Sequence, residues 1–162
     1  MVIWMTGLSG AGKSTLADEL EGFVNIDGDV LRKGLCSDLG FSEEDRRENM
    51  RRLRELCKLL SKLNHHVVTS FISPYEDERR RAKEEIPNCS IVWVKSSLDK
   101  CIDRDTKGMY AKAIKGEIPE FTGISSPYEE PVLCDLVIDT EKQSVEESVL
   151  QLVDFITERI NR

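Results

Sequence analysis

The sequence lacks the long apolar runs and the basic excess that membrane proteins and nucleic-acid-binding proteins require. No stretch approaches the roughly 18 apolar residues of a membrane span. The formal net charge is −7, whereas proteins that bind a phosphate backbone carry excess basic charge on one face. We therefore expect no membrane partner and no nucleic-acid partner.

The five cysteines form no recognisable disulfide or zinc pattern. Their number is odd, their spacings are wide, no C-x-x-C pair occurs, and only His65 and His66 are available to assist them in binding metal. We expect reduced, mostly buried thiols. An apolar, strand-like segment begins at Val2, which leaves no room for a secretory signal peptide, so we expect a cytoplasmic protein.

Apolar, β-branched segments alternate with polar, helical ones along the chain. The apolar segments are VIWMTG, FVNID, HHVVTSFI, CSIVWVK and CDLVID. This alternation is typical of a parallel sheet with crossover helices. The sequence predicts an α/β fold, three-layered and doubly wound, with a mostly parallel five-stranded sheet. No repeat or linker divides the 162 residues, so we expect a single domain over 1–162.

Two helices have clear start signals. Ser42 and Asp45 resemble a capping box, and a stripe of apolar residues follows at Met50, Leu53, Cys57 and Leu60. Arg46 and Asn49 extend this stripe, so we expect both side chains to face inward. Ser144 and Glu147 form a capping box before the last helix, which should bury Val149, Leu152, Val153, Ile156 and Ile160.

Residues 105–131 show no sustained period. Glycine, proline, lysine and aromatic residues are mixed in KGMYAKAIKGEIPEFTGISSPYEEP. A long irregular connection inside a compact domain is usually functional or disordered. Because lysines and aromatics suit contact with an anionic ligand better than a linker role, we expect a mobile lid.

A phosphate-binding loop follows the first strand. Gly7, Gly12, Lys13 and Ser14 match G-x-x-x-x-G-K-[ST] in full, and the helical segment TLADEL comes next. The glycines let the backbone N–H groups point inward, Lys13 reaches the β- and γ-phosphates, and the Ser14 hydroxyl binds Mg²⁺. The motif predicts a fold of the P-loop NTPase type, with a nucleoside triphosphate and Mg²⁺ as ligands.

The ends of the other strands distinguish among P-loop proteins. No N-K-x-D guanine signature and no Walker-B Asp-Glu pair is present, which disfavours a GTPase and a motor ATPase. Instead, Asp27 and Asp29 follow the second apolar segment, beside the loop in a doubly wound sheet. Carboxylates there can hold Mg²⁺ through water or take a proton from an acceptor hydroxyl. The alternative for each is a simple Asp-Gly turn.

A second cluster has the chemistry of an acceptor site. Arg32 and Arg46 can bind anionic oxygens in bidentate fashion, Phe41 offers a stacking surface, and Asn49 adds an amide. We expect an anionic and aromatic acceptor. From the residues alone, Phe41 could equally belong to the core, as could Phe121.

The sequence resembles adenylyl-sulfate kinases in five segments, namely GLSGAGKST, DGDVLRKGLCSDLGFSEEDRRENMRR, TSFISPYEDERR, RDTKGMYAKAIKGEIPEFTGI and PYEEP. The likeness runs from the first strand to about Thr140. It implies transfer of the ATP γ-phosphate to the 3′-hydroxyl of adenosine 5′-phosphosulfate, which yields 3′-phosphoadenylyl sulfate and ADP in sulfate activation. It also suggests a homodimer.

The resemblance assigns roles to individual residues. The catalytic residues would be Lys13, Asp29, Ser73 and Lys107. ATP would be bound by Gly7, Ser9, Gly10, Ala11, Gly12, Lys13, Ser14, Thr15 and Arg104, with Mg²⁺ on Ser14 and, through water, on Asp27 or Asp29. The acceptor would be bound by Asp27, Asp29, Arg32, Phe41, Arg46, Asn49, Ile72, Ser73, Lys107 and Phe121. The two phenylalanines would sandwich its adenine.

Some of these roles have alternatives. Arg104 either contacts ATP phosphates or pairs with Asp103 or Asp105. The family has been described as forming a phosphoserine at the position of Ser73, yet direct in-line transfer needs none, and we favour direct transfer with Ser73 donating a hydrogen bond. Val30 stands where the family often has Asn, so one polar contact to the acceptor is either missing or made by the backbone alone.

Two other functions remain open at this point. One is a P-loop kinase for a different hydroxyl acceptor, such as a nucleoside or a sugar acid, which would need no adenine sandwich. The other is a nucleotide-binding regulator without transfer activity, against which the intact Lys13, Ser14, Asp29 and Lys107 argue.

Overall fold

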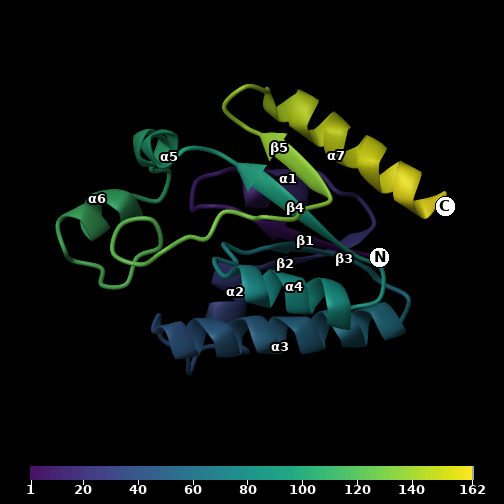
Figure 1. Cartoon of the computed structure of the whole chain (residues 1–162), viewed down its shortest axis with the longest axis horizontal. Helices are drawn as coiled ribbons and strands as arrows, with labels where there is room; N and C mark the ends of the chain where they lie inside the picture. Colours follow the sequence, from purple (N-terminus) through teal and green to yellow (C-terminus); the bar gives the residue numbers. More distant parts are fainter. Residues whose placement is uncertain (162) are drawn as a thin grey trace.

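The computed structural model describes residues 1–161. Five strands form one parallel sheet in the order β2-β3-β1-β4-β5 (Figure 1). They are β1 (Val2–Thr6), β2 (Phe23–Asp27), β3 (His66–Ser70), β4 (Cys89–Lys95) and β5 (Leu136–Asp139). The central strand, β1, is buried along its whole length, as its continuous apolar run predicts.

Seven helices accompany the strands in this part of the chain. They are α1 (Lys13–Asp18), α2 (Gly28–Lys33), α3 (Glu43–Lys62), α4 (Glu76–Glu85), α5 (Leu98–Arg104), α6 (Met109–Ile114) and α7 (Val145–Ile160). Helices α3 and α4 cover one face of the sheet, and α1 and α7 cover the other (Figure 1). The predicted three-layer, doubly wound architecture is confirmed.

The core consists of two apolar clusters, one on each face of the sheet. Successive side chains of a strand point to opposite faces, so Ile3 and Met5 pack with α1 and α7, whereas Val2 and Trp4 pack with α3 and α4. All five cysteines are free thiols, and all except Cys134 are buried. No helix within residues 1–161 has the length and apolar character needed to cross a membrane.

Helix α3 begins where the sequence predicts. The Ser42 hydroxyl accepts a hydrogen bond from the Asp45 N–H at 3.1 Å, but the Asp45 carboxylate accepts from the Gly40 N–H, so the reciprocal half of the capping box is missing. Arg46 and Asn49 are 8 % and 3 % exposed. Their predicted inward orientation is confirmed, which places two polar side chains at the edge of the buried stripe.

Helix α7 carries the full capping box of Ser144 and Glu147, as predicted. Leu152 and Ile156 are buried, but Val153 is 39 % and Ile160 is 54 % exposed, so the prediction for those two residues was wrong. Helix α7 packs on α1 and on the edge strand β5 (Figure 1).

The segment predicted to be a lid leaves the sheet after α5. It contains α6 and one isolated bridge between Thr122 and Ser126, and the rest is irregular. It extends from the carboxyl end of the sheet, beside the loop that joins β1 to α1 (Figure 1). The irregular character of residues 105–131 is thus largely as predicted, and its mobility stays a prediction.

Candidate functional site

The loop between β1 and α1 depends on its glycines. A Cβ on Gly7 would lie 2.4 Å from the Val94 carbonyl oxygen at the end of β4, so only glycine fits there. Gly12 has a φ of +106° and caps α1, a left-handed conformation that favours glycine. These two positions let the backbone turn tightly enough to form a cradle.

Lys13 lies inside this cradle. Its ammonium donates hydrogen bonds to the carbonyl oxygens of Gly7 and Leu8 at 2.8 and 2.7 Å. Burial lowers the pKa of Lys13 to about 8, and the nearby charge of Lys107 also lowers it, while Asp27 and Asp29 act in the opposite direction. A buried ammonium of this kind gains from an anion placed beside it.

Asp27 joins the cradle to the ends of β2 and β3. Its Oδ2 accepts hydrogen bonds from the hydroxyls of Ser14 at 2.9 Å and Ser70 at 3.0 Å, and its Oδ1 accepts from the Asp29 N–H at 2.8 Å. Burial alone would raise the pKa of Asp27, but these hydrogen bonds hold it below its usual range. The carboxylate is therefore ionised beside the Ser14 hydroxyl.

Asp29 has a different environment. Its side chain is 62 % exposed and forms an ion pair with the ammonium of Lys107, which is 58 % exposed. The structure thus brings together a carboxylate from α2 and a lysine from the lid, 78 residues apart in the sequence.

The predicted acceptor cluster converges on Phe41. The guanidinium carbon of Arg32 lies 4.3 Å from the centre of the Phe41 ring, and that of Arg46 lies 5.7 Å away. Phe41 is 48 % exposed, which excludes the alternative that it belongs to the core. Burial lowers the pKa of Arg32, and the positive charge of Arg46 lowers it further. Two cations beside one exposed ring favour an aromatic anion.

Asn49 and Phe121 are two further residues predicted to bind the acceptor. Among the described residues, the buried Oδ1 of Asn49 has no hydrogen-bond partner. Arg46 donates to the carbonyl oxygens of Phe41 and Glu120, so it connects the segment that carries Phe41 with the segment that carries Phe121. The Phe121 ring is half-buried and packs edge-on against Tyr110, with ring centres 5.0 Å apart. The adenine sandwich stays a prediction.

Ile72 and Ser73 form a turn directly after β3. The Ile72 carbonyl accepts from the Gly7 N–H at 3.2 Å. Ser73 is 1 % exposed, and its φ of +46° lies in the left-handed region. Its hydroxyl accepts from the Trp4 indole N–H at 3.0 Å. A side chain buried in this way stabilises the turn, while its predicted catalytic role stays a prediction.

Arg104 supports the cradle from α5. Its guanidinium donates to the Gly10 carbonyl at 3.2 Å and to the Thr140 carbonyl at 2.7 Å. Pairing with Asp103 or Asp105 was the alternative, but within residues 1–161 Arg104 forms an ion pair with neither, and the Asp105 carboxylate accepts from the N–H groups of Tyr110 and Ala111 at the start of α6. Arg104 therefore lies against the loop, beside the predicted phosphate site.

The remaining predicted loop residues lie around the same cradle. Ser9 accepts a hydrogen bond from the Tyr110 hydroxyl at 2.8 Å, and Ala11 accepts one from the Thr140 hydroxyl at 2.9 Å. Thr15 is exposed in the first turn of α1.

Four residues around the site were not predicted, namely Tyr110, Thr140, Arg79 and Tyr128. Tyr110 and Thr140 fix the loop, whereas Arg79 connects the lid with Ser73 and Tyr128 connects the lid with the end of β1. The aromatic Tyr110 in KGMY was the one available signal, because the other three depend on contacts between distant segments.

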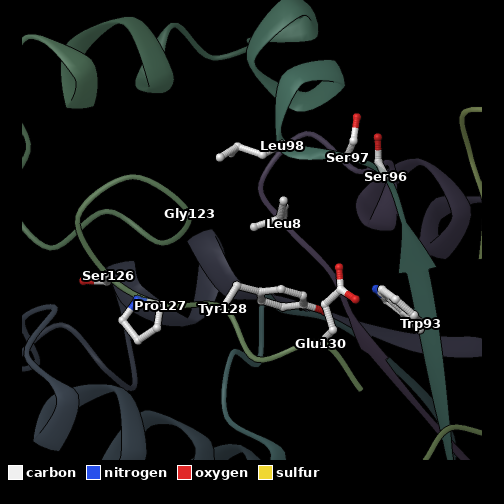
Figure 2. Close-up of a pocket in the computed structure, with 10 residues that line it drawn as sticks. All are labelled: Leu8, Trp93, Ser96, Ser97, Leu98, Gly123, Ser126, Pro127, Tyr128 and Glu130. Atoms are coloured by element: carbon white, nitrogen blue, oxygen red, sulfur yellow. The ribbon is translucent and has the colours of Figure 1, made fainter. Parts of the chain in front are cut away.

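A cavity of about 310 Å³ lies beside the cradle, between the end of β4 and the irregular returning part of the lid (Figure 2). Leu8, Leu98 and Tyr128 form its apolar walls, and Ser96, Ser97 and Glu130 add polar groups. No residue predicted to bind ATP or the acceptor lines this cavity.

Comparison with known proteins places this site in a family context. The profile of the family described as Adenylylsulphate kinase matches residues 1–139. The chain is 49 % identical to an adenylyl-sulfate kinase of Vibrio cholerae over 98 % of this chain and 78 % of the relative. It is 46 % identical to an adenylyl-sulfate kinase of Acaryochloris marina over 98 % of this chain and 82 % of the relative.

The fold agrees with a solved structure of the same kind. The Mycobacterium tuberculosis APS kinase CysC, in complex with AMPPNP and APS, superposes with a TM-score of 0.90 and is 39 % identical. The superposition covers 96 % of each chain.

Proposed function

The chain belongs to the adenylylsulphate kinase family, and on this premise we propose that it transfers the γ-phosphate of ATP to the 3′-hydroxyl of adenosine 5′-phosphosulfate. The products are 3′-phosphoadenylyl sulfate and ADP. The observation that best supports this acceptor is the placement of Arg32 and Arg46 at the exposed ring of Phe41, with the buried amide of Asn49 nearby.

On the donor side, the loop from Gly7 to Thr15 binds the phosphates of ATP. Lys13 is already held at the loop carbonyls by two hydrogen bonds, so its ammonium moves from these neutral acceptors to the phosphate oxygens. Arg104 holds the loop against Thr140 and contributes positive charge at its rim. These residues position the γ-phosphate and stabilise the negative charge on its oxygens.

The residues present fit Mg²⁺. Hard oxygen ligands suit this ion, which commonly takes one or two carboxylates together with substrate phosphates, and the Ser14 hydroxyl and the ionised Asp27 lie within 2.9 Å of each other. The described residues hold no group of three acidic, histidine or cysteine side chains, and such a site needs none. Bound there by Ser14, with Asp27 reached through water, Mg²⁺ would neutralise charge on the β- and γ-phosphates.

On the acceptor side, Arg32 and Arg46 bind the phosphosulfate, Phe41 and Phe121 enclose the adenine, and Ile72 contributes to the wall. Asp29 orients the 3′-hydroxyl and accepts its proton as the bond to phosphorus forms. Asp27 is less suited to that task, because four hydrogen bonds already engage its oxygens.

Lys107 of the lid neutralises charge on the transferred phosphoryl group. Its ion pair with Asp29 already brings it to the carboxylate that receives the proton. Ser73 is buried, and its hydroxyl oxygen accepts a hydrogen bond from the Trp4 indole N–H, which favours direct in-line transfer over a phosphoserine.

We also propose the cytoplasm as the compartment of this reaction, and a homodimer as the assembly, which the family resemblance suggests. Analytical ultracentrifugation of the purified protein tests the assembly: a sedimenting mass of twice 18.4 kDa supports the dimer, and a mass of one chain contradicts it.

The acceptor is tested by ADP release from MgATP with adenosine 5′-phosphosulfate, adenosine, AMP or gluconate offered separately. Release that depends on the phosphosulfate supports the proposal. Release with gluconate or adenosine instead would overturn the acceptor assignment, and no release with any of them would favour a regulator that binds nucleotide without transfer.

A further inference from the structure

A buried guanidinium joins the lid to the predicted acceptor pocket. Arg79 lies on α4 and is 1 % exposed. Its Nη1 donates to the Ser73 carbonyl at 2.6 Å, and its Nη2 donates to the Glu129 carbonyl and to the Glu76 carboxylate, both at 2.6 Å. One side chain therefore binds the turn after β3, the returning end of the lid and its own helix.

Further hydrogen bonds connect the same segments. The Tyr128 and Thr6 hydroxyls are 3.0 Å apart, which ties the lid to the end of β1. The Glu129 N–H donates to the Pro74 carbonyl at 2.9 Å, and the Glu129 carboxylate accepts from the Glu76 N–H at 2.7 Å. Residues 128 and 129 are thus held by β1, by the turn and by α4.

The turn itself needs this support. Ser73 adopts a left-handed φ, which costs free energy for a residue with a Cβ and persists only where surrounding contacts enforce it. Thr6 and Arg79 both donate to the Ser73 carbonyl, at 3.0 and 2.6 Å. Loss of the Arg79 contacts would therefore release the turn as well as the lid.

The two ends of the lid are held differently. The outgoing part carries the exposed residues Lys107, Lys112 and Lys115, and Lys107 forms an exposed ion pair with Asp29, whereas Tyr110 and Ala113 of the same part are buried. The returning end is held by buried hydrogen bonds to Arg79. Opening of the outgoing part would have to break the buried contacts of Tyr110, whereas the returning end would stay held at Arg79.

We propose that Arg79 is a positioning residue for phosphoryl transfer, which holds the Ile72–Ser73 turn and anchors the returning end of the lid so that Lys107 and Phe121 close onto the acceptor. The expected effect of this role on the KM for the acceptor rests on the proposed function. Arg79 acts through the turn and the lid, since its donors are engaged by the protein's own oxygens.

Arg79→Lys tests this, because lysine keeps the charge but lacks the planar guanidinium that donates hydrogen bonds to several oxygens at once. Arg80→Lys is the matched control, since Arg80 is the next residue on the same helix, with a side chain that is 70 % exposed. Below the melting temperature of each variant, we expect Arg79→Lys to raise the KM for adenosine 5′-phosphosulfate about tenfold or more, because small displacements at a reacting centre are costly. Affinity for an ATP analogue and the kinetics of Arg80→Lys should stay at wild-type values.

A purely structural role predicts a different result. Arg79→Lys would then lower the melting temperature and the active fraction, and the remaining active enzyme would keep the wild-type KM. That outcome overturns the inference. If Arg79→Lys does not fold, Tyr128→Phe removes the hydroxyl that meets Thr6 and should raise the same KM by a smaller factor; an unchanged KM in that variant contradicts the inference.

A second measurement does not require the reaction. Trypsin cleavage after Lys112 and Lys115, followed by mass spectrometry, reports opening of the lid, because proteolysis tracks the population of open forms. We expect Arg79→Lys to be cut at least about tenfold faster than the wild type and Arg80→Lys. Equal cleavage rates overturn the anchor. A difference in cleavage together with no transfer to adenosine 5′-phosphosulfate in the wild type would instead leave the anchor intact and refute the proposed function.

Discussion

Lys107, on the lid, forms an ion pair with Asp29 at the start of α2. Both side chains are more than half exposed, so water screens the pair and its contribution to stability is small. Its importance is positional: the lid lysine that would approach the transferred phosphoryl group lies at the carboxylate that would receive the acceptor proton.

The two aspartates at the end of β2 should have separable roles. We expect Asp29→Asn to lower kcat about 10²–10⁴-fold, because loss of a positioned general base typically has this effect. Asp27→Asn should act mainly on MgATP binding, since Asp27 is bonded to Ser14. Steady-state kinetics with each substrate varied separates the two, and the exposed Asp103→Asn is the control. Equal losses of kcat in both variants would contradict the assignment of the base to Asp29.

Phe41 should contribute to acceptor binding by stacking. Its ring is 48 % exposed beside two guanidiniums, so we expect Phe41→Ala to weaken acceptor binding by about 1–3 kcal/mol, the usual range for a base stacked on an aromatic side chain. Isothermal titration calorimetry with adenosine 5′-phosphosulfate measures this directly. Leu35→Ala, at another exposed apolar residue in the same connection, should bind normally. An unchanged affinity in Phe41→Ala would show that the ring does not touch the base.

Gly7 should be intolerant of any side chain. The Cβ of Gly7→Ala would meet the Val94 carbonyl at 2.4 Å, so the loop or the end of β4 must shift. We expect a loss of more than about 2 kcal/mol in the free energy of unfolding, together with loss of nucleotide binding. Urea denaturation measures the first. The control is Gly34→Ala, where a Cβ meets nothing within 4 Å; equal stability of the two variants would contradict the close approach.

The acid stability of the fold should depend on Asp135. Burial alone would raise its pKa, but the ion pair with Lys83, the Ile91 N–H and Arg159 hold it below the ordinary 3.8. A carboxyl with a depressed folded pKa contributes stability that is present above about pH 4 and lost as the pH falls through the folded pKa. We expect Asp135→Asn to be about 1–3 kcal/mol less stable at pH 7.

Urea denaturation of the same variant from pH 7 to pH 2.5 checks the direction of this effect. The difference between wild type and Asp135→Asn should shrink toward the acid end. Asp154→Asn, an exposed position on α7, should parallel the wild type throughout. A constant difference across the whole range would show that Asp135 contributes through its shape and not through its charge.

The sheet and the inward side of α3 could be predicted because both depend on local periodicity. Arg46 and Asn49 continue the stripe of Met50, Leu53 and Cys57, and all five are buried. The same reasoning failed for Val153 and Ile160, because an apolar stripe does not tell how far a neighbouring sheet extends. Helix α7 packs at β5, which is the edge strand of the sheet, and both residues are exposed.

The site could be predicted where a motif fixes the backbone and could not where distant segments meet. Lys13 and Ser14 follow from the loop motif. Arg79 lies in the run ERRR, where nothing in the sequence distinguishes it from its neighbours, and it is bound by the lid that returns 50 residues later. Arg104 had two candidate partners in the sequence, and only the three-dimensional arrangement selects the loop and Thr140.

The most direct test of the account follows the phosphoryl group itself. The purified protein is incubated with Mg²⁺, ATP labelled with ³²P at the γ-position and adenosine 5′-phosphosulfate, and the labelled product is digested with a 3′-nucleotidase. The account predicts label on a nucleotide before digestion, release of that label as inorganic phosphate by the 3′-nucleotidase, and none on protein trapped in denaturant. Label recovered only as inorganic phosphate before digestion would contradict it.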